Sequence, residues 1–314
     1  MCAERLSRIL AKCQACVDAN NFYEAHQMYR TLYFRYNAQH KYEDALELLY
    51  KGSVTLLQHR QQTSGTDLAS LFINTLTSSS SPVLEDPVNK VAHLFQCMES
   101  DNPGRQVYLI ESINWTIKVD PKYKSGHPIL HKKYGLIFWT EKNYEQARYH
   151  FLHSTDGANT AALLIEYHVS RGFPSEVDLF IAQAVLQFLC LQNKDTANVV
   201  FLKYTKEHPH LKKGPPFLMP LLNFIWFLLL ALDTGKVSLF TILCEKYETS
   251  INRDPAYKEY LDRIGQLFFG LPPPKQSPHG ILGNLLQSLF GAEDDREQDS
   301  AMGSSTEVTA EELD

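Results

Sequence analysis

The chain has 314 residues, of which 44% are hydrophobic, so it can bury a sizeable core as two globular domains or as one elongated repeat array. Its formal charge of -6 is concentrated at the C-terminus, because residues 293–314 carry nine acidic side chains and a single Arg, which leaves about +2 for the remainder. A body this close to neutral lacks the clustered basic surface that nucleic acid requires, so nucleic acid is excluded as a partner.

The start of the chain does not resemble a secretory signal, because Glu4, Arg5, Arg8 and Lys12 interrupt every apolar run. Six cysteines are spread over the chain, and most of them lie in apolar helical patterns instead of at loop positions that staple a small secreted fold. This distribution favours a reducing compartment. We therefore expect a protein of the cytosol.

The first 60 residues predict three amphipathic helices, because apolar residues recur there every three or four positions. A cassette of an aromatic residue, then Glu, then Ala opens the second and third helices and returns once later, at 22–25, 42–45 and 144–147. Such a cassette is typical of tetratricopeptide-like arrays, since the small Ala lets a neighbouring helix approach. Ala25 and Ala45 are 20 residues apart, which fits one helix and a short turn, so the array should be irregular.

Turn signals then recur every 15 to 25 residues as far as residue 235, and no segment has the sustained alternation of a strand. Helices that are apolar on two sides must be covered on both, which stacking into a solenoid achieves. We therefore expect an all-α chain, a right-handed α-solenoid of tetratricopeptide-like helical hairpins. At roughly 20 residues per helix, it should contain about fourteen helices up to residue 290.

The most apolar segment, LLNFIWFLLLAL at 221–232, is too short to cross a membrane, since twelve helical residues span roughly 18 Å of a hydrocarbon core of roughly 30 Å. We expect a helix buried on all sides, with a docking surface for a partner helix or an apolar client as the alternative. The Pro-rich run at 270–274 should end the stack. Beyond it, 281–290 predicts a short amphipathic helix, and the acidic residues from 292 onward predict disorder.

The sequence contains no phosphate-binding glycine loop, no glycine-flanked nucleophilic Ser and no HExxH metalloprotease motif. The remaining candidates for chemistry are one CxxC and two closely spaced histidine pairs: Cys13–Cys16, His127–His131 and His150–His153. A lone CxxC on an apolar stripe is usually buried and inert, and two imidazoles alone rarely hold a metal. We therefore predict packing residues, no enzyme, and no bound metal or cofactor.

The segment DANNFYEAHQMYRTLYFRY at 18–36 resembles the second-helix signature of the Golgi-to-ER traffic protein 4 family. Further similarities follow in the same order at 65–68, 114–118, 148–152, 175–178, 220–226, 262–266 and 274–276. The resemblance thus runs from about residue 5 to residue 290. It implies an α-solenoid adaptor that helps to deliver tail-anchored membrane proteins, and it allows one small β-hairpin in the C-terminal half.

In this family the N-terminal helices contact the targeting ATPase. The C-terminal helices hold a ubiquitin-like subunit or, in animal-type members, the BAG-family scaffold chaperone that carries it, which keeps that chaperone in the cytosol. The resemblance therefore implies an ATPase-binding half at 1–155, a partner-binding half at 156–290 and a disordered acidic tail at 291–314. It implies no cofactor and no direct insertion into a membrane.

The resemblance places the ATPase contact on the N-terminal helices, where helical spacing and the family's acidic position give seven candidate residues: Arg5, Arg8, Lys12, His26, Arg30, Arg35 and Asp67. The three on the first helix form a basic stripe roughly 120° from the apolar one. On the second helix, His26 and Arg30 are expected on a solvated face with Tyr33, opposite the packed stripe, and Arg35 lies on another flank. A solvated helix face without a partner is the alternative.

Asp67 admits two interpretations. It matches the position of a regulatory acid that contacts the ATPase in this family, or it caps a helix that begins at Thr66 and Asp67. Some members carry a basic residue just beyond the pair Arg35–Tyr36, where this chain has Ala38 and Gln39. That difference predicts a weaker ATPase contact.

For the C-terminal partner, we expect a groove built from the 221–232 helix, the Pro-rich break and the 281–290 helix. Its candidate residues are Phe224, Trp226, Phe227, Leu271, Ile281, Leu285, Leu286 and Leu289. The alternative is that 281–290 folds back to cap the solenoid. Two other functions fit the same fold, namely a direct chaperone for apolar segments and a generic scaffold of the proteasome-lid or vesicle-coat type.

Overall fold

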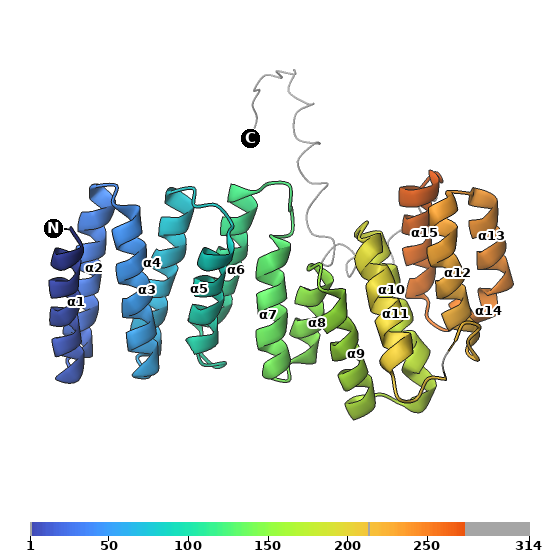
Figure 1. Ribbon diagram of the computed structural model, residues 1–314, viewed down its shortest axis with the longest axis horizontal. Helices are drawn as coiled ribbons and strands as arrows, with labels where there is room; N and C mark the ends of the chain where they lie inside the picture. The colour runs from blue at the N-terminus through green and yellow to red at the C-terminus, as the bar shows by residue number, and fades with distance from the viewer. Residues whose placement is uncertain (1, 213, 274–314) are drawn as a thin grey trace, which may run out of the picture. The chain divides into compact units, whose positions relative to one another are not determined.

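Fifteen α-helices and one short 3-10 helix follow one another along the part of the chain that the computed structural model describes, residues 2–212 and 214–273, and this part contains no strand (Figure 1). The first eight helices are α1 (Cys2–Asp18), α2 (Phe22–Ala38), α3 (Tyr42–Gln58), α4 (Gln62–Ser78), α5 (Glu85–Cys97), α6 (Gly104–Val119), α7 (Pro128–Thr140) and α8 (Tyr144–Leu152). They are followed by α9 (Gly157–Arg171), η1 (Pro174–Glu176), α10 (Val177–Cys190), α11 (Lys194–Glu207), α12 (Pro220–Thr234), α13 (Val237–Lys246), α14 (Glu248–Ile251) and α15 (Ala256–Phe269). The predicted all-α solenoid is confirmed.

Two positions after the end of each of the first four helices stands a residue with a left-handed backbone. Asn20, His40, Arg60 and Ser80 have φ between 50° and 59°. The amide that follows each of them donates to the carbonyl five residues earlier, at 2.8 to 3.0 Å. This is the hydrogen bond of a Schellman C-cap, which satisfies a carbonyl that the helix end leaves open. These four residues recur every 20 positions, but none of them is Gly. The sequence therefore contains no glycine pattern from which these helix ends could be predicted.

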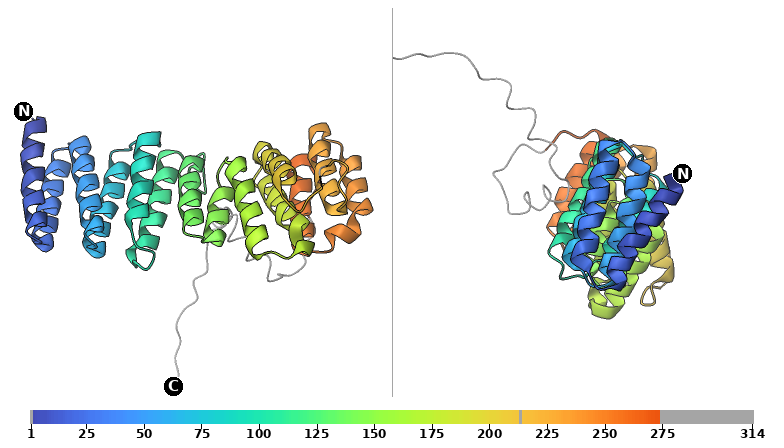
Figure 2. Two further views of the ribbon diagram at one scale, coloured as in Figure 1. Left: turned by 60° about the horizontal axis from the view of Figure 1, so that its bottom comes forward. Right: turned by 90° about the vertical axis from the view of Figure 1, so that its left-hand side faces the viewer.

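The helices pack in two layers, because most of them contact the next helix, the one after it, or both. α1, α3, α5 and α7 follow one another in one layer, and α2, α4 and α6 in the other. Beyond α7 the alternation returns, with α8, α10 and α12 in one layer and α9 and α11 in the other. The left panel of Figure 2 shows this row from the side, and the right panel views it from the α1 end.

Small residues are the points at which neighbouring helices come closest, as the cassette predicts. Ala25, Ala45 and Ala147 are fully buried. Gly52 on α3 lies so near α2 that a Cβ at this position would stand 2.8 Å from Cδ1 of Tyr29. The close approach of α2 and α3 therefore depends on the absence of a side chain at Gly52.

The last described helix returns to pack against α10. Tyr257 Oη donates to the Leu179 carbonyl at 3.2 Å, and Gln187 Nε2 donates to Tyr260 Oη at 3.1 Å. Gly270, with φ of 66°, ends α15 just before the prolines, where the Pro-rich run predicts that helical structure stops. The helix expected at 281–290 and the disorder expected at 291–314 lie outside the described residues.

None of the helices in the described ranges is both long enough and apolar enough to span a membrane. The longest helices have 17 residues and are amphipathic, and the most apolar one, α12, has only 15. The prediction that the apolar segment at 221–232 is too short to cross a membrane is therefore confirmed.

Candidate partner-binding surfaces

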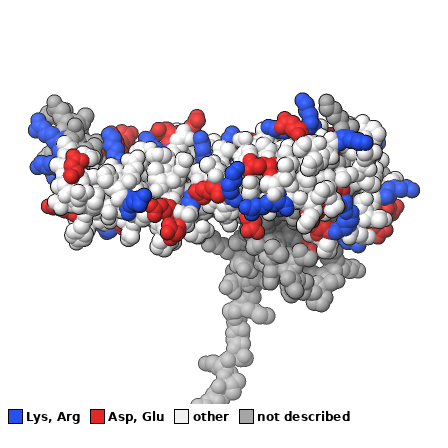
Figure 3. Space-filling view, turned by 90° about the horizontal axis from the view of Figure 1, so that it is seen from below, with Lys and Arg blue, Asp and Glu red and all other residues white. Residues whose placement is uncertain are grey.

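Basic side chains lie exposed at the α1 end of the described unit. Arg8 and Lys12 on α1 and Arg35 on α2 are exposed. Arg5 belongs to the same helix as Arg8, but its side chain is outside the described set. Figure 3 shows basic side chains gathered at this end of the face that it views, whereas acidic and basic side chains alternate along the rest. This end can therefore attract an acidic partner.

The other three residues predicted for the ATPase contact bind one another. His26 Nε2 lies 2.8 Å from Asp67 Oδ2, and Arg30 Nη1 donates to both carboxylate oxygens of Asp67 at 3.0 and 2.9 Å. His26 is only 9% exposed, and Tyr33, predicted to share its solvated face, is 7% exposed. The prediction that His26 and Arg30 lie on a face opposite the packed stripe is therefore wrong, because α2 is covered by α4 as well as by α3.

Asp67 does not cap a helix. α4 begins at Gln62, which puts Thr66 and Asp67 in its second turn. Thr66 is buried, and its hydroxyl accepts a hydrogen bond from Asn102 Nδ2 at 2.8 Å. The capping interpretation is therefore wrong. The Asp67 side chain keeps 35% of its surface exposed while it balances the charge of Arg30, so a partner can still reach its carboxylate.

The α12 helix is buried on most of its circumference but not on all of it. Phe224 is fully buried and therefore cannot touch a partner. Trp226 is half-buried, whereas Phe227 and Leu230 are 37% and 48% exposed. The expectation of burial on all sides is therefore wrong, because Phe227 and Leu230 form a strip that no helix within residues 2–212 and 214–273 covers. That strip supports the alternative of a docking surface.

The neighbouring helix α13 also exposes apolar residues, which the sequence pattern did not reveal. α13 packs against α12, and its Val237, Leu239 and Ile242 are exposed. The signal in the sequence was the run VSLFTIL, which has no consistently polar face although only Phe240 in it is buried. An exposed apolar area on two adjacent helices is typical of a protein interaction site.

The other residues proposed for the C-terminal groove do not join this surface in the described structure. Leu271 is half-buried, and its amide donates to the Gly265 carbonyl at 3.1 Å, so it closes the end of α15. Ile281, Leu285, Leu286 and Leu289 lie outside the described residues. The groove predicted from 281–290 therefore stays a prediction.

Most of the histidines and cysteines that were singled out by spacing are packing residues, whereas His127 caps α7 by accepting the N–H of Ile129 at 3.3 Å. His131 and His150 are buried, with their Nδ1 atoms 2.9 Å apart. Burial lowers the pKa of His131 to about 3 and that of His153 to about 4. Cys13 is fully buried, and burial raises its thiol pKa to about 11, so this thiol is a poor nucleophile.

Comparisons with protein families, with curated proteins and with solved structures all match this chain to the same family, over most or nearly all of its length. The family model for Golgi to ER traffic protein 4 matches residues 39–290. The Golgi to ER traffic protein 4 homolog of Oryzias latipes is 52% identical over 292 residues, covering 92% of this chain and 90% of that protein, and the human homolog is 49% identical over 306 residues, covering 96% and 93%. The crystal structure of C. therm. Get4 matches with a TM-score of 0.79 at 28% identity, covering 96% of this chain and 100% of that one.

Proposed function

Since the chain belongs to the Golgi to ER traffic protein 4 family, we propose that it is a cytosolic adaptor in the delivery of tail-anchored membrane proteins. It binds the targeting ATPase through the N-terminal half of the solenoid. Through the C-terminal half it binds the BAG-family scaffold chaperone and its ubiquitin-like subunit, and it thereby retains that chaperone in the cytosol. It performs no catalysis itself.

One observation supports this proposal above the others: three exposed cations lie on the first two helices of the solenoid, whereas the most apolar helix exposes a strip in the other half. Arg8, Lys12 and Arg35 belong to α1 and α2, whereas Phe227 and Leu230 belong to α12. A charged surface recognises its partner by electrostatic complementarity, and an apolar one by burying area. One chain can therefore hold two different proteins at the same time.

The ATPase contact is tested by reversing charge on α1. The double variant Arg8→Glu/Lys12→Glu should weaken binding to the targeting ATPase by about tenfold or more, because it replaces attraction by repulsion at exposed positions. Affinity of the unaltered chain should also fall as salt is raised, since exposed charges are screened. Calorimetric titration at low and high ionic strength measures both effects.

A charge-matched control uses two exposed lysines at the other end of the fold, Lys206→Glu/Lys212→Glu. This variant carries the same change in net charge, so it should bind the ATPase like the unaltered chain. Equal weakening in both variants would mean that net charge matters and the α1 surface does not. An affinity that does not change with salt would also contradict a charged interface.

The scaffold contact is tested on the exposed strip of α12. Phe227→Asp and Leu230→Asp should each abolish most binding of the scaffold chaperone, because each places a charge in an apolar interface. Val107→Asp on α6 is the control, since Val107 is an equally apolar residue that is 55% exposed in the other half of the chain. Retained binding in the α12 variants would exclude this strip as the scaffold site.

A direct chaperone for apolar segments is the second candidate, and the exposed strip of α12 with α13 favours it. In that case the purified chain should crosslink to a tail-anchor peptide without either partner, and Leu230→Asp should remove the crosslink. If Phe227→Asp and Leu230→Asp lose the scaffold chaperone while no peptide crosslink forms with the unaltered chain, the adaptor role stands and the chaperone role fails. A pull-down from cytosol that returned proteasome-lid or vesicle-coat subunits would instead favour a generic scaffold.

A further inference from the structure

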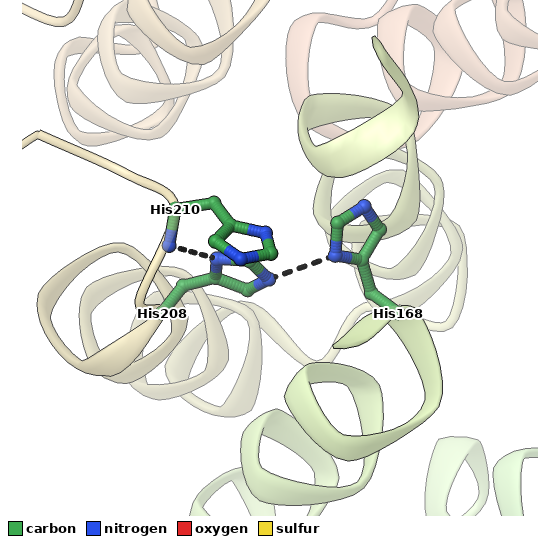
Figure 4. Close-up of side chains that lie close together, drawn as sticks. All are labelled: His168, His208 and His210. Carbon is green, nitrogen blue, oxygen red and sulfur yellow. Dashed lines mark hydrogen bonds between the residues drawn. The ribbon is translucent and has the colours of Figure 1, made fainter. Parts of the chain in front are cut away.

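Three histidines that the sequence analysis did not single out meet where α9 and α11 end (Figure 4). His168 lies in the last turn of α9, His208 follows directly after α11, and His210 stands two residues farther along the connection to α12. His168 and His208 are 1% and 3% exposed, whereas His210 is exposed. One ring nitrogen from each of the three lies within 4.8 Å of the others.

Hydrogen bonds orient the two buried rings toward each other. His168 Nε2 lies 3.0 Å from the Phe173 carbonyl oxygen, so this nitrogen carries the proton and Nδ1 carries a lone pair. His208 Nε2 lies 3.0 Å from that Nδ1, and His208 Nδ1 accepts the backbone N–H of His210 at 3.1 Å. In the metal-free chain, the two side-chain nitrogens that face each other are therefore held by one bond on the far side of each ring.

We propose that His168, His208 and His210 form a binding site for a divalent transition metal of the zinc class. Zinc binds imidazole nitrogen at about 2.0–2.1 Å, so two ligands of one tetrahedral ion stand roughly 3.3 Å apart. The 3.0 Å between His168 Nδ1 and His208 Nε2 is close to that separation. His210 completes the set from the solvent side by a movement of its exposed ring.

The surroundings of His168 are those of a supported metal ligand. Its Nε2–H donates to a backbone carbonyl, which is the bond that typically fixes the tautomer of a metal-binding histidine. Phe180 packs edge-on against this ring with the two centroids 5.1 Å apart, and Tyr204 lies 4.9 Å from the ring of His208. These aromatic walls hold the two buried rings in place and leave the His210 side open for a fourth ligand.

Metal binding requires a change of tautomer at His208 and leaves all three imidazole rings neutral. His208 must place its proton on Nδ1 so that Nε2 can bind the metal, and the backbone N–H of His210 is then released. Residues 208–212 and 214–219 form no helix, so this connection can adjust. Neutral imidazole is the form that binds metal.

The donor set selects the kind of metal. Three imidazoles suit zinc, copper, nickel and cobalt, whereas calcium and magnesium require oxygen ligands. A bound ion would clamp the connection after α11 to the end of α9. Because α12 begins at the far end of that connection, the clamp would stabilise the apolar surface of α12 and α13.

The test is a titration of the full chain, stripped with a chelator, with zinc chloride. We expect one zinc ion per chain by calorimetry and a higher thermal unfolding temperature when zinc is present. His210→Gln should lower zinc affinity by at least about tenfold and remove the thermal shift, with an unchanged circular dichroism spectrum because His210 is exposed. His59→Gln, which alters another exposed histidine just after a helix, should bind zinc like the unaltered chain.

Cobalt distinguishes this site from the cysteines. Bound cobalt should give the visible bands of tetrahedral coordination without the near-ultraviolet charge-transfer band of a thiolate ligand. A thiolate band would assign the metal to cysteine and overturn the proposal. So would the absence of any zinc binding, or equal affinity in the unaltered chain and His210→Gln.

Discussion

At the scale of single residues, Asp178 shows how a buried charge joins distant parts of the chain. Its side chain on α10 is almost fully buried and pairs with Arg253, which lies between α14 and α15. Arg253 also donates from Nη2 to the Ser175 carbonyl at 3.0 Å. Within the described residues, Asp178 Oδ1 has no protein partner, so Arg253 is the main group that compensates this carboxylate. Removing Arg253 would therefore leave a buried charge uncompensated.

We expect Arg253→Ala to lower the free energy of unfolding by about 2 kcal/mol. Breaking a fully buried ion pair costs roughly 3–5 kcal/mol, and the loss is smaller here because the Arg253 side chain is 37% exposed and water can partly replace it. Urea unfolding at neutral pH measures the difference. Lys258→Ala, at an exposed position of α15, should change stability by less than about 0.5 kcal/mol. Indistinguishable values for the two variants would contradict the assigned role of Arg253.

At the scale of elements, α7 and α8 are joined by rings that must stay neutral. His131 on α7 lies against His150 on α8, and the ring of His153 has its centroid 5.2 Å from that of His131. Burial lowers all three pKa values below the ordinary value of histidine, to about 3 for His131 and about 4 for His153. In the folded chain these three imidazoles therefore stay unprotonated at pH values at which they would bind protons in the unfolded chain.

This arrangement predicts acid lability. Unfolded histidines take up protons below about pH 6.5, whereas the folded rings stay neutral until about pH 4 and below, so stability present above pH 6.5 is lost as the pH falls through that window. Each ring contributes at most about 2 kcal/mol between pH 7 and pH 5. The free energy of unfolding, measured across this pH range, should depend less steeply on pH in His153→Leu, because this variant lacks one of the three rings. The exposed His40→Gln is the control and should keep the full slope; equal slopes in all three proteins would disprove the effect.

At the scale of the whole described unit, the stability of each helix depends mainly on its neighbours in the row. Each helix contacts helices one or two places away, and the main exception is α15, which returns to α10. In such arrays stability is approximately a sum of repeat and nearest-neighbour terms, so damage at one point is felt mainly by the adjacent helices.

Leu56→Ala on α3 should therefore raise amide hydrogen exchange in α2 to α5 and leave α10 to α12 nearly unchanged. Leu56 is fully buried, and such truncations cost roughly 2–5 kcal/mol. Leu186→Ala on α10, also fully buried, should produce the reverse pattern. Exchange followed by mass spectrometry distinguishes the regions. A uniform increase over all helices in either variant would show a single cooperative unit and contradict this prediction.

Much of the fold could be predicted because it depends on neighbours in the sequence. The three-to-four periodicity predicted the helices, and the cassette at 22–25, 42–45 and 144–147 predicted the close contacts at Ala25, Ala45 and Ala147. These signals are local, since a helix brings together residues only three or four positions apart. The burial of Cys13 follows from the same pattern.

The candidate sites could be predicted only in part, because they join residues from different helices. Nothing in the sequence paired His26 with Asp67, which are 41 residues apart, and so His26 was placed on a solvated face although α4 covers it. The same limit applies to His168 and His208, 40 residues apart.

The sequence by itself therefore determined that the chain is helical, which residues open its helices and which family it resembles. The tertiary structure decided that Asp67 balances Arg30, that Phe224 is buried while Phe227 and Leu230 are exposed, and that three histidines converge after α11. The reason is that periodicity states which residues share a face of one helix, whereas the neighbour that covers that face is chosen by packing among all the helices.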